Sequence, residues 1–421
     1  MAPGDAAATT GNEQRRTDER CRCCGGPVEV VLDLGETPVA DLLLDSDELG
    51  RDEPTFALLV GFCTECALLQ LVELLDQDGL YTDDYPYYTS EVPGLVDHFG
   101  QSARALLAEM DLGPTSLVVE AASNDGYMLR IFAETGIPVL GVDPASGPAA
   151  VATEVGVPTI VDYFSSTLCH RLAETHGPSD LLLGNNVLNL VPDPLDFAEA
   201  ADRLLKQSGV VVLEVPYLLD TVDAGAFDNF FHQNSSYFSA TSLARLFERV
   251  GMVLSDVERV DTFGGSLRVT IARGSHHGPR AATLLADEER RGVANAEFYR
   301  EFARRAAACR RELVGLLDQL HSEGNRIVAY GAAGGMATTL LSYTEIDSMI
   351  EYAVDANPHK HGKFTPGSHL EIRPADVLTV DQPDIVLLLA WNYRDAVLEA
   401  QSEYRRKGGR FLIPIPHPEL V

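Results

Sequence analysis

Four cysteines near the start of the chain have the type and spacing of a metal site. Cys21 and Cys24 form one Cys-x-x-Cys pair, and Cys63 and Cys66 form a second. Two-residue gaps let both thiolates of a pair face one tetrahedral ion, so the spacing predicts a zinc site. Cysteine fills all four positions and leaves none for water, which predicts a structural zinc. A chance pairing of core thiols, or a redox dithiol, is the alternative.

The other three cysteines lack this spacing. Cys23 is expected to be a bystander, although it could replace a neighbour as ligand. Cys169 and Cys309 have no partner in sequence and are expected to be ordinary buried thiols.

A second candidate site follows a strand expected at residues 116–120. Glu120 ends this strand, and a turn of small residues containing Asn124, Asp125 and Gly126 leads into a helix. A strand, a tight turn and a helix N-terminus begin a nucleotide-binding fold. The pattern therefore predicts a bound cofactor at this turn.

The next expected strand, residues 139–143, indicates which cofactor. It ends at Asp143, with Pro144 after it, and a carboxylate here can hold ribose hydroxyls. Ala122 stands in place of a glycine of Gly-x-Gly-x-x-Gly, so the turn resembles motif I of class I methyltransferases, which bind S-adenosylmethionine (SAM). A sulfonium cofactor brings no pyrophosphate, and its ammonium group prefers acidic or carbonyl partners. A plain Rossmann domain is the alternative.

The elements that position these residues alternate between strands and helices. Further strands are expected at residues 158–161, 180–183 and 210–215, with Asn185 and Asn186 just after the second. Open α/β sheets bind ligands at the carboxyl ends of their strands, which places both asparagines beside the cofactor.

A second α/β unit follows a long helical pattern at residues 280–322. A strand at residues 326–330 leads into a glycine-rich turn, residues 331–335, and a helix. Such a turn can hold a phosphate, or can merely allow close packing of helix on sheet. Further strands are expected at residues 350–355, 384–389 and 410–413.

The fold class expected from these patterns is α/β with three parts. They are an N-terminal zinc-binding module, a central class I SAM methyltransferase Rossmann-like domain, and a C-terminal second α/β Rossmann-like domain. The boundaries expected are a disordered lead-in at 1–19, the zinc module at 20–80, the SAM-binding domain at 81–278, a helical connector at 279–322 and the C-terminal domain at 323–421.

Charge and hydropathy exclude several partners. A net charge of −31 disfavours nucleic acid and anionic lipid, because both need clustered Lys and Arg. The first residues do not resemble a signal peptide and no apolar run reaches membrane-spanning length, so a cytoplasmic location is expected. An anionic substrate would need a locally basic pocket. We expect a monomer or a weak homodimer.

From about Arg20 to the C-terminus, the chain resembles a known family. Its motifs resemble those of the zinc-containing, SAM-dependent C-methyltransferases of deoxysugar biosynthesis, which act on dTDP-linked 4-ketosugars. The segments that carry the resemblance are residues 21–25, 34–40, 63–71, 84–87, 120–126, 185–188, 214–217, 264–268, 330–333, 360–367 and 391–392. The resemblance implies a dTDP-linked deoxysugar as substrate and a C-terminal domain that binds the sugar nucleotide.

The chemistry of that family follows from the substrate. A ketone at C4 acidifies the hydrogen on C3, so a positioned base can remove it. Nearby donors must then stabilise the enolate oxygen, and the carbanion takes the methyl group in an in-line displacement. The resemblance implies that the base and its helpers come from a Tyr-His-Glu-His segment and from a histidine after Asn-Asn-Val-Leu.

This chain departs from the family at those positions. Phe231, Gln233 and Asn234 replace the tyrosine, the glutamate and the second histidine of the segment, and Leu190 stands at the position of the other histidine. None of the four can act as a base near pH 7. Gln233 and Asn234 keep size and hydrogen bonding, so a pocket with altered proton chemistry is expected. Gly335 replaces a lysine of the C-terminal glycine turn.

Three functions remain open from the sequence. The protein could still methylate C3, with His232 or a tyrosine of the Tyr85 and Tyr87 pair moving the proton. It could couple C-methylation to 4-ketoreduction by NADPH, as some family members do. It could also be a non-catalytic protein that binds SAM or dTDP-sugar and partners a glycosyltransferase. Retention of the cofactor motif favours an enzyme.

The remaining candidates are cations and aromatic residues implied by the resemblance. An acidic protein must concentrate cations to hold a sugar diphosphate, although surface charge is the alternative. His98 falls within a helical pattern and is expected to be an ordinary helix histidine. The candidate substrate-binding residues are Arg268, Lys360, Lys363, Trp391 and Asn392.

Overall fold

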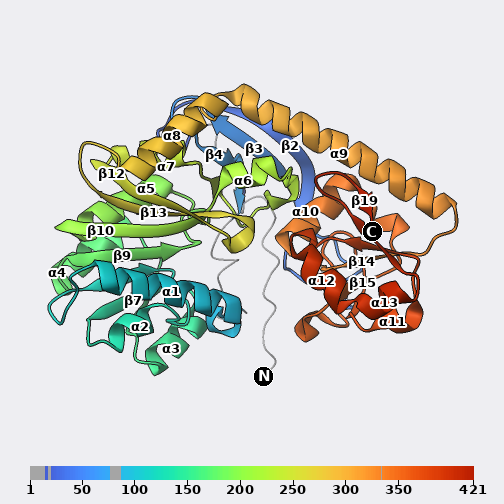
Figure 1. Ribbon diagram of the computed structural model, residues 1–421, viewed down its shortest axis with the longest axis horizontal. Helices are drawn as coiled ribbons and strands as arrows, with labels where there is room; N and C mark the ends of the chain where they lie inside the picture. The colour runs from blue at the N-terminus through green and yellow to red at the C-terminus, as the bar shows by residue number, and fades with distance from the viewer. Residues whose placement is uncertain (1–14, 18–19, 76–86, 333) are drawn as a thin grey trace, which may run out of the picture.

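The computed structural model describes residues 15–17, 20–75, 87–332 and 334–421. Figure 1 shows two α/β units, green to yellow on one side and orange to red on the other, with the N-terminal strands in blue above and between them. The three-part α/β fold expected from the sequence is confirmed. No helix in the described ranges is long and apolar enough to cross a membrane.

The N-terminal module is built on a long antiparallel hairpin. Its sheet has the order β11-β4-β3-β2, and β11 belongs to the central part of the chain. A separate short pair joins β1 to β5. The strands are β1 (Arg15–Thr17), β2 (Val28–Pro38), β3 (Thr55–Cys63), β4 (Leu69–Leu71), β5 (Glu73–Leu75) and β11 (Ser236–Tyr237).

The central domain has a seven-stranded sheet of order β12-β13-β10-β9-β6-β7-β8. Strands β6 to β10 are parallel, whereas β13 runs antiparallel to both of its neighbours. The strands are β6 (Val118–Ala121), β7 (Val139–Asp143), β8 (Thr159–Val161), β9 (Ser179–Asn185), β10 (Leu205–Pro216), β12 (Met252–Val260) and β13 (Ser266–Arg273). The helices are α1 (Pro93–Glu109), α2 (Leu129–Ala133), α3 (Ser146–Glu154), α4 (Ser166–Thr175), α5 (Pro194–Leu204), α6 (Leu218–Asp223) and α7 (Ala240–Glu248).

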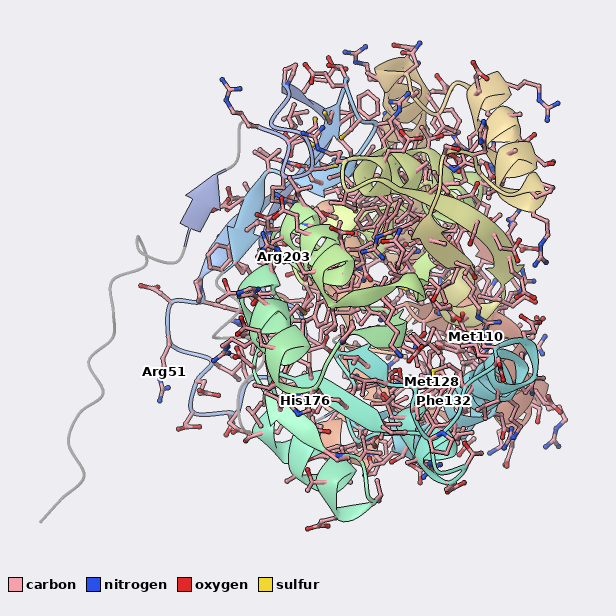
Figure 2. All side chains as sticks on the ribbon, turned by 90° about the vertical axis from the view of Figure 1, so that its left-hand side faces the viewer. Arg51, Met110, Met128, Phe132, His176 and Arg203 are labelled. Carbon is pink, nitrogen blue, oxygen red and sulfur yellow. The ribbon has the colours of Figure 1, made fainter. Side chains whose placement is uncertain are left out.

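Helices cover both faces of this sheet, and successive side chains of a buried strand pack against different helices. Val118 packs with α1, α2 and α3, whereas Val119 packs with α4, α5 and α7. Side chains in a strand alternate in direction, so a continuous apolar run needs helices on both sides. Met128 and Phe132, labelled in Figure 2, are fully buried in the first layer.

The C-terminal domain follows two connecting helices, of which α9 crosses the top of Figure 1. Its sheet has the order β16-β15-β14-β17-β18-β19, parallel except for β19. The strands are β14 (Ile327–Tyr330), β15 (Ala353–Asp355), β16 (Ile372–Pro374), β17 (Ile385–Leu388), β18 (Arg410–Ile413) and β19 (Glu419–Leu420). The helices are α8 (Pro279–Arg291), α9 (Ala296–Ser322), α10 (Gly335–Thr344), α11 (Val377–Asp381), α12 (Arg394–Ala400) and α13 (Ser402–Arg406).

The connection between β2 and β3 contacts the C-terminal domain. Leu44 pairs with Phe364 in an isolated β-bridge, and Lys363 forms an ion pair of 3.1 Å with Asp45. At the other end of the hairpin, the side chain of Arg22 donates to the backbone oxygens of Leu71 and Ser235. The N-terminal module therefore spans both α/β domains.

Candidate active site and metal site

The four predicted cysteines come together in one cluster. Their sulfur atoms all lie within 4.8 Å of one another, with 3.3 Å between the Sγ atoms of Cys21 and Cys66 and 3.4 Å between those of Cys24 and Cys63. A tetrahedral zinc with four sulfurs at ~2.3 Å needs sulfur atoms about 3.8 Å apart, so the donor set fits that ion. Cys23 is buried outside the cluster.

The cofactor turn has a backbone that alternates into the left-handed region. The φ angles are +53° at Ala122, +49° at Asn124 and +76° at Gly126. Asp143, at the end of β7, accepts hydrogen bonds from the backbone N–H groups of Asn124 (2.8 Å) and Ala145 (2.9 Å). One oxygen of the predicted carboxylate is bonded to the cofactor turn and the other to the loop after β7. Asp143 therefore holds both loops in place. Burial raises the pKa of Asp143.

Near this turn lie two buried carboxylate oxygens to which no described protein group donates a hydrogen bond. Glu120 is fully buried, and burial raises its pKa to about 8. Its Oε1 accepts from the side-chain amide of Asn185 at 3.0 Å. Within the described residues, Glu120 Oε2 and Asp125 Oδ1 are buried without a hydrogen-bond partner. Unpaired buried acceptors are costly, so they fit a ligand that brings donors, as the ammonium and hydroxyl groups of SAM do.

The segment that carries Tyr87 is fastened to the same turn. Asn124 donates to the backbone oxygen of Tyr87 (3.0 Å) and accepts from the N–H of Thr89 (2.8 Å). Asp125 accepts from the N–H of Ser90 at 3.0 Å. We call these three bonds the 87–90 clamp. Tyr85 lies outside the described residues.

The side chain of Tyr87 lies within electrostatic range of the C-terminal domain. Its side chain is partly exposed, and its pKa is raised by burial, then by the nearby Tyr393 and Asp125. Tyr393 belongs to the short turn η7 (Trp391–Tyr393). The structure therefore brings the predicted tyrosine close to the predicted Trp391 and Asn392 segment.

The predicted catalytic residues of the 231–234 loop contact other protein groups. His232 is buried, its Nδ1 lies 3.2 Å from Thr37 Oγ1, and burial lowers its pKa to about 4. Gln233 donates to the backbone oxygen of Ala40 at 2.8 Å, and Asn234 accepts from Asn189 at 2.8 Å. The contacts of His232 and Gln233 fasten the loop to the N-terminal module, and that of Asn234 fastens it to the central domain. Proton transfer by His232 stays a prediction.

Phe231 of this loop and Asp228 just before it contact the C-terminal domain. A Cβ atom on Gly335 would lie 2.6 Å from Cγ of Phe231, so the ring packs directly against Gly335. Trp391 donates its indole N–H to Asp228 at 2.7 Å, and burial raises the pKa of that fully buried carboxyl to about 7. Trp391 therefore lies at the junction between domains, with its donor already used, while Asn392 is exposed.

The three predicted cations are not brought together. Arg268, on the central sheet, pairs with Glu214 (3.0 Å) and Glu258 (3.2 Å). Lys360 and Lys363 belong to the C-terminal domain. Lys360 lies 3.6 Å from Asp355, and Lys363 pairs with Asp45 as described above. Each cation already has an acidic partner, which weakens the case for a preformed diphosphate site built from all three.

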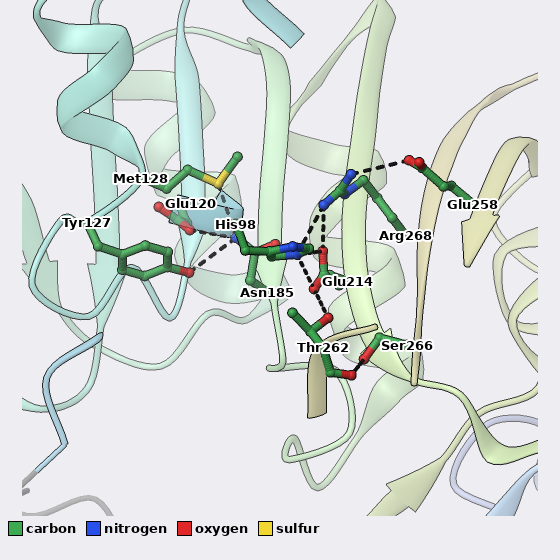
Figure 3. Close-up of polar contacts among 10 residues, drawn as sticks. All are labelled: His98, Glu120, Tyr127, Met128, Asn185, Glu214, Glu258, Thr262, Ser266 and Arg268. Carbon is green, nitrogen blue, oxygen red and sulfur yellow. Dashed lines mark hydrogen bonds and ion pairs between the residues drawn. The ribbon is translucent and has the colours of Figure 1, made fainter. Parts of the chain in front are cut away.

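A polar network around Glu214, near the carboxyl end of β10, was not expected from the sequence. Figure 3 shows it. Nε2 of His98 lies 2.7 Å and 2.9 Å from the two carboxylate oxygens of Glu214. Thr262 donates to Glu214 at 2.6 Å, and Arg268 at 3.0 Å. A glutamate at the end of an otherwise apolar strand was the available signal, because a buried charge needs partners.

Three family models match successive parts of the chain. They are a zinc binding domain at residues 21–81, a methyltransferase domain at 97–256 and a C-methyltransferase C-terminal domain at 261–416. The C-methyltransferase NovU of Streptomyces niveus is 33% identical over 410 residues, which cover 96% of this chain and 97% of NovU. The chain belongs to this C-methyltransferase family.

Two further relatives each align with less than half of this C-methyltransferase. A ubiquinone biosynthesis O-methyltransferase of Pseudomonas paraeruginosa is 33% identical over 100 residues, 23% of this chain and 42% of the relative. Among solved structures, the SAM-bound magnesium protoporphyrin IX methyltransferase of Synechocystis PCC 6803 aligns with 43% of this chain and 80% of its own. That alignment has a TM-score of 0.34 and 14% identity. The match to the methyltransferase domain and the alignment with NovU along nearly the whole chain identify the protein as a SAM-dependent methyltransferase.

Proposed function

We propose that the protein transfers a methyl group from SAM to C3 of a dTDP-linked 4-keto-deoxysugar. The observation that carries the proposal is the unpaired acidic oxygens beside the turn after β6, in a chain that aligns with a C-methyltransferase along nearly its whole length. The substrate class rests on the motif resemblance, which extends into the C-terminal domain.

The chain supplies the binding chemistry for the cofactor. Glu120 and Asp125 offer buried oxygens to the ammonium or hydroxyl groups, and Asp143 holds the turn that surrounds them. SAM, when bound, supplies the methyl group as an electrophile on a sulfonium. The 87–90 clamp joins the backbone of the Tyr87 segment to the cofactor turn, which supports a role for this segment beside the cofactor.

We place the sugar nucleotide between the Tyr87 segment and the C-terminal domain. The glycine-rich turn after β14 opens α10, and a helix N-terminus preceded by glycines favours phosphate oxygens. Lys360 lies beside that turn, 3.3 Å from the backbone oxygen of Ala332. The 4-keto sugar would then point from this turn towards the central domain.

The test is incubation of the purified protein with dTDP-4-keto-deoxysugars and SAM, with and without NADPH, followed by mass spectrometry. We expect a gain of one methylene unit that depends on SAM alone. A gain of two hydrogens with NADPH would add the ketoreductase function. SAM binding by calorimetry without turnover would overturn the proposal in favour of a non-catalytic binding protein.

A further inference from the structure

A buried carboxylate fixes the orientation of His98. Glu214 is 3% exposed, and both of its oxygens lie within 2.9 Å of Nε2 of His98. Thr262 and Arg268 bond to the same carboxylate and prevent it from turning away. Arg268 Nη2 also lies 3.1 Å from Nε2. Because the two carboxylate oxygens of Glu214 are closer to Nε2, we assign the proton to Nε2, which leaves the lone pair of the imidazole on Nδ1.

His98 lies where the reacting part of a substrate would be. Glu214 pairs in register with Asn185 of β9, and the amide of Asn185 reaches Glu120 on β6. The chain runs from β6 to β7 and β8 on one side, and returns as β9 and β10 on the other. Ligands of open α/β sheets bind at such a switch point, outside the carboxyl ends of the strands.

The two halves of this edge of the sheet carry different functional groups. On the β6 side lie the acidic acceptors that fit SAM, Glu120 and Asp125. On the β9 and β10 side lies the His98–Glu214 pair, and Figure 3 shows Asn185 between Glu120 and this pair. The side chain of His98 is 21% exposed, so it is open to a ligand at this edge. Within the described residues, its Nδ1 has no hydrogen-bond partner.

We propose that His98 is the base that removes the proton from the carbon beside the ketone, with Glu214 as its positioning residue. This inference rests on the proposed function. The C–H bond breaks, its proton goes to Nδ1, and its electron pair forms the enolate. The enolate carbon then forms a bond to the methyl group as the methyl–sulfur bond breaks, leaving S-adenosylhomocysteine. The imidazolium, stabilised by Glu214, releases the proton to water.

The geometry favours His98 over His232 as the base. The ring of His232 is buried against Thr37 and Phe56 of the N-terminal hairpin, away from solvent. A second histidine paired with glutamate, His277, provides a contrast. Its Nε2 lies 3.1 Å from Glu248 and its Nδ1 accepts from the backbone N–H of Leu254. It follows the end of β13, at the opposite edge of the sheet.

The test separates proton removal from methyl transfer. The protein is incubated in D₂O with a dTDP-4-keto-deoxysugar and S-adenosylhomocysteine, and deuterium uptake beside the ketone is followed by NMR. His98→Gln keeps a donor to Glu214 but removes the base, so we expect exchange to fall about 100-fold or more. His277→Gln is the matched control and should exchange at the wild-type rate. Glu214→Gln should lower the kcat for exchange with little change in KM.

Thermal melting and SAM binding show whether each variant is folded. If His98→Gln does not fold, His98→Ala with added imidazole replaces it, and restored exchange supports the assignment. Exchange by a folded His98→Gln within a few-fold of wild type, or no rescue of folded His98→Ala, would overturn His98 as the base while the methyltransferase proposal stands. A wild type that neither exchanges nor methylates refutes the proposed function, and this inference with it.

Discussion

At the scale of single residues, the cofactor site depends on carboxyls kept out of water. Glu120 is fully buried, and its pKa of about 8 is above the ordinary value of 4.5 because burial disfavours the charge. Between these values, the folded protein binds more protons than the unfolded chain. Stability is therefore lost as the pH rises through this range, and the loss is complete above about pH 8.

Glu120→Gln should remove this pH dependence, because the amide is neutral at every pH. We expect the difference in melting temperature, variant minus wild type, to increase from pH 5 to pH 9 in the absence of SAM. Scanning calorimetry at several pH values checks it. A difference that stays constant with pH would show that Glu120 is ionised throughout.

A second residue-scale prediction concerns Asp143, whose oxygens order the cofactor turn and the start of α3. Asp143→Asn places an amide donor against one of the two backbone donors. We expect SAM to bind about 10- to 100-fold more weakly, since an unpaired buried group costs about 1–3 kcal/mol. Calorimetric titration measures this, with the exposed Asp111→Asn as control. Equal affinities would contradict the assignment.

At the scale of elements, short loops hold the site together. The 87–90 clamp depends on Asn124, whose φ of +49° makes glycine the substitution that removes the side chain without straining the backbone. Asn124→Gly should increase hydrogen exchange at residues 87–91. Asn186→Gly is the matched control, because Asn186 has a similar φ of +51°. Unchanged exchange in Asn124→Gly would mean that other contacts hold this segment.

The packing of Phe231 on Gly335 can be tested by a double-mutant cycle. Gly335→Ala adds a Cβ 2.6 Å from the ring, and overpacking of this kind costs about 1–3 kcal/mol. In the background of Phe231→Ala, the same substitution should cost much less. Melting temperatures of the four proteins give the coupling. Additive effects would show that the ring moves aside freely.

At the scale of the whole molecule, the zinc module connects the two α/β domains. Arg22, between two cysteines of the cluster, holds the backbone oxygen of Ser235, next to the 231–234 loop. Chelation of the metal should therefore increase hydrogen exchange in residues 21–71 and also in 231–237. Strand β14 should keep its protection. Cys23→Ser should retain one zinc per chain, whereas Cys66→Ser should lose it. Protection at 231–237 that survives chelation would contradict this coupling.

The sequence was sufficient for the architecture and for the cysteine cluster, because both follow local patterns. An apolar strand such as 139–143 and the Cys-x-x-Cys spacing can both be recognised from residues that are close in sequence. The role of loop residues could not be predicted in this way. His232 is far in sequence from Thr37, and only the folded hairpin shows that the two are in contact. His98 looked like an ordinary helix residue because Glu214 lies 116 positions away.

The position of the transferred methyl group tests the proposed C3 methylation directly. The protein is incubated with a dTDP-4-keto-deoxysugar and SAM labelled with ¹³C in its methyl group, and the product is examined by NMR. If the protein methylates C3, the labelled methyl group is bonded to C3 of the product. A label on oxygen or nitrogen, or no incorporation by a folded protein that binds SAM, would contradict it.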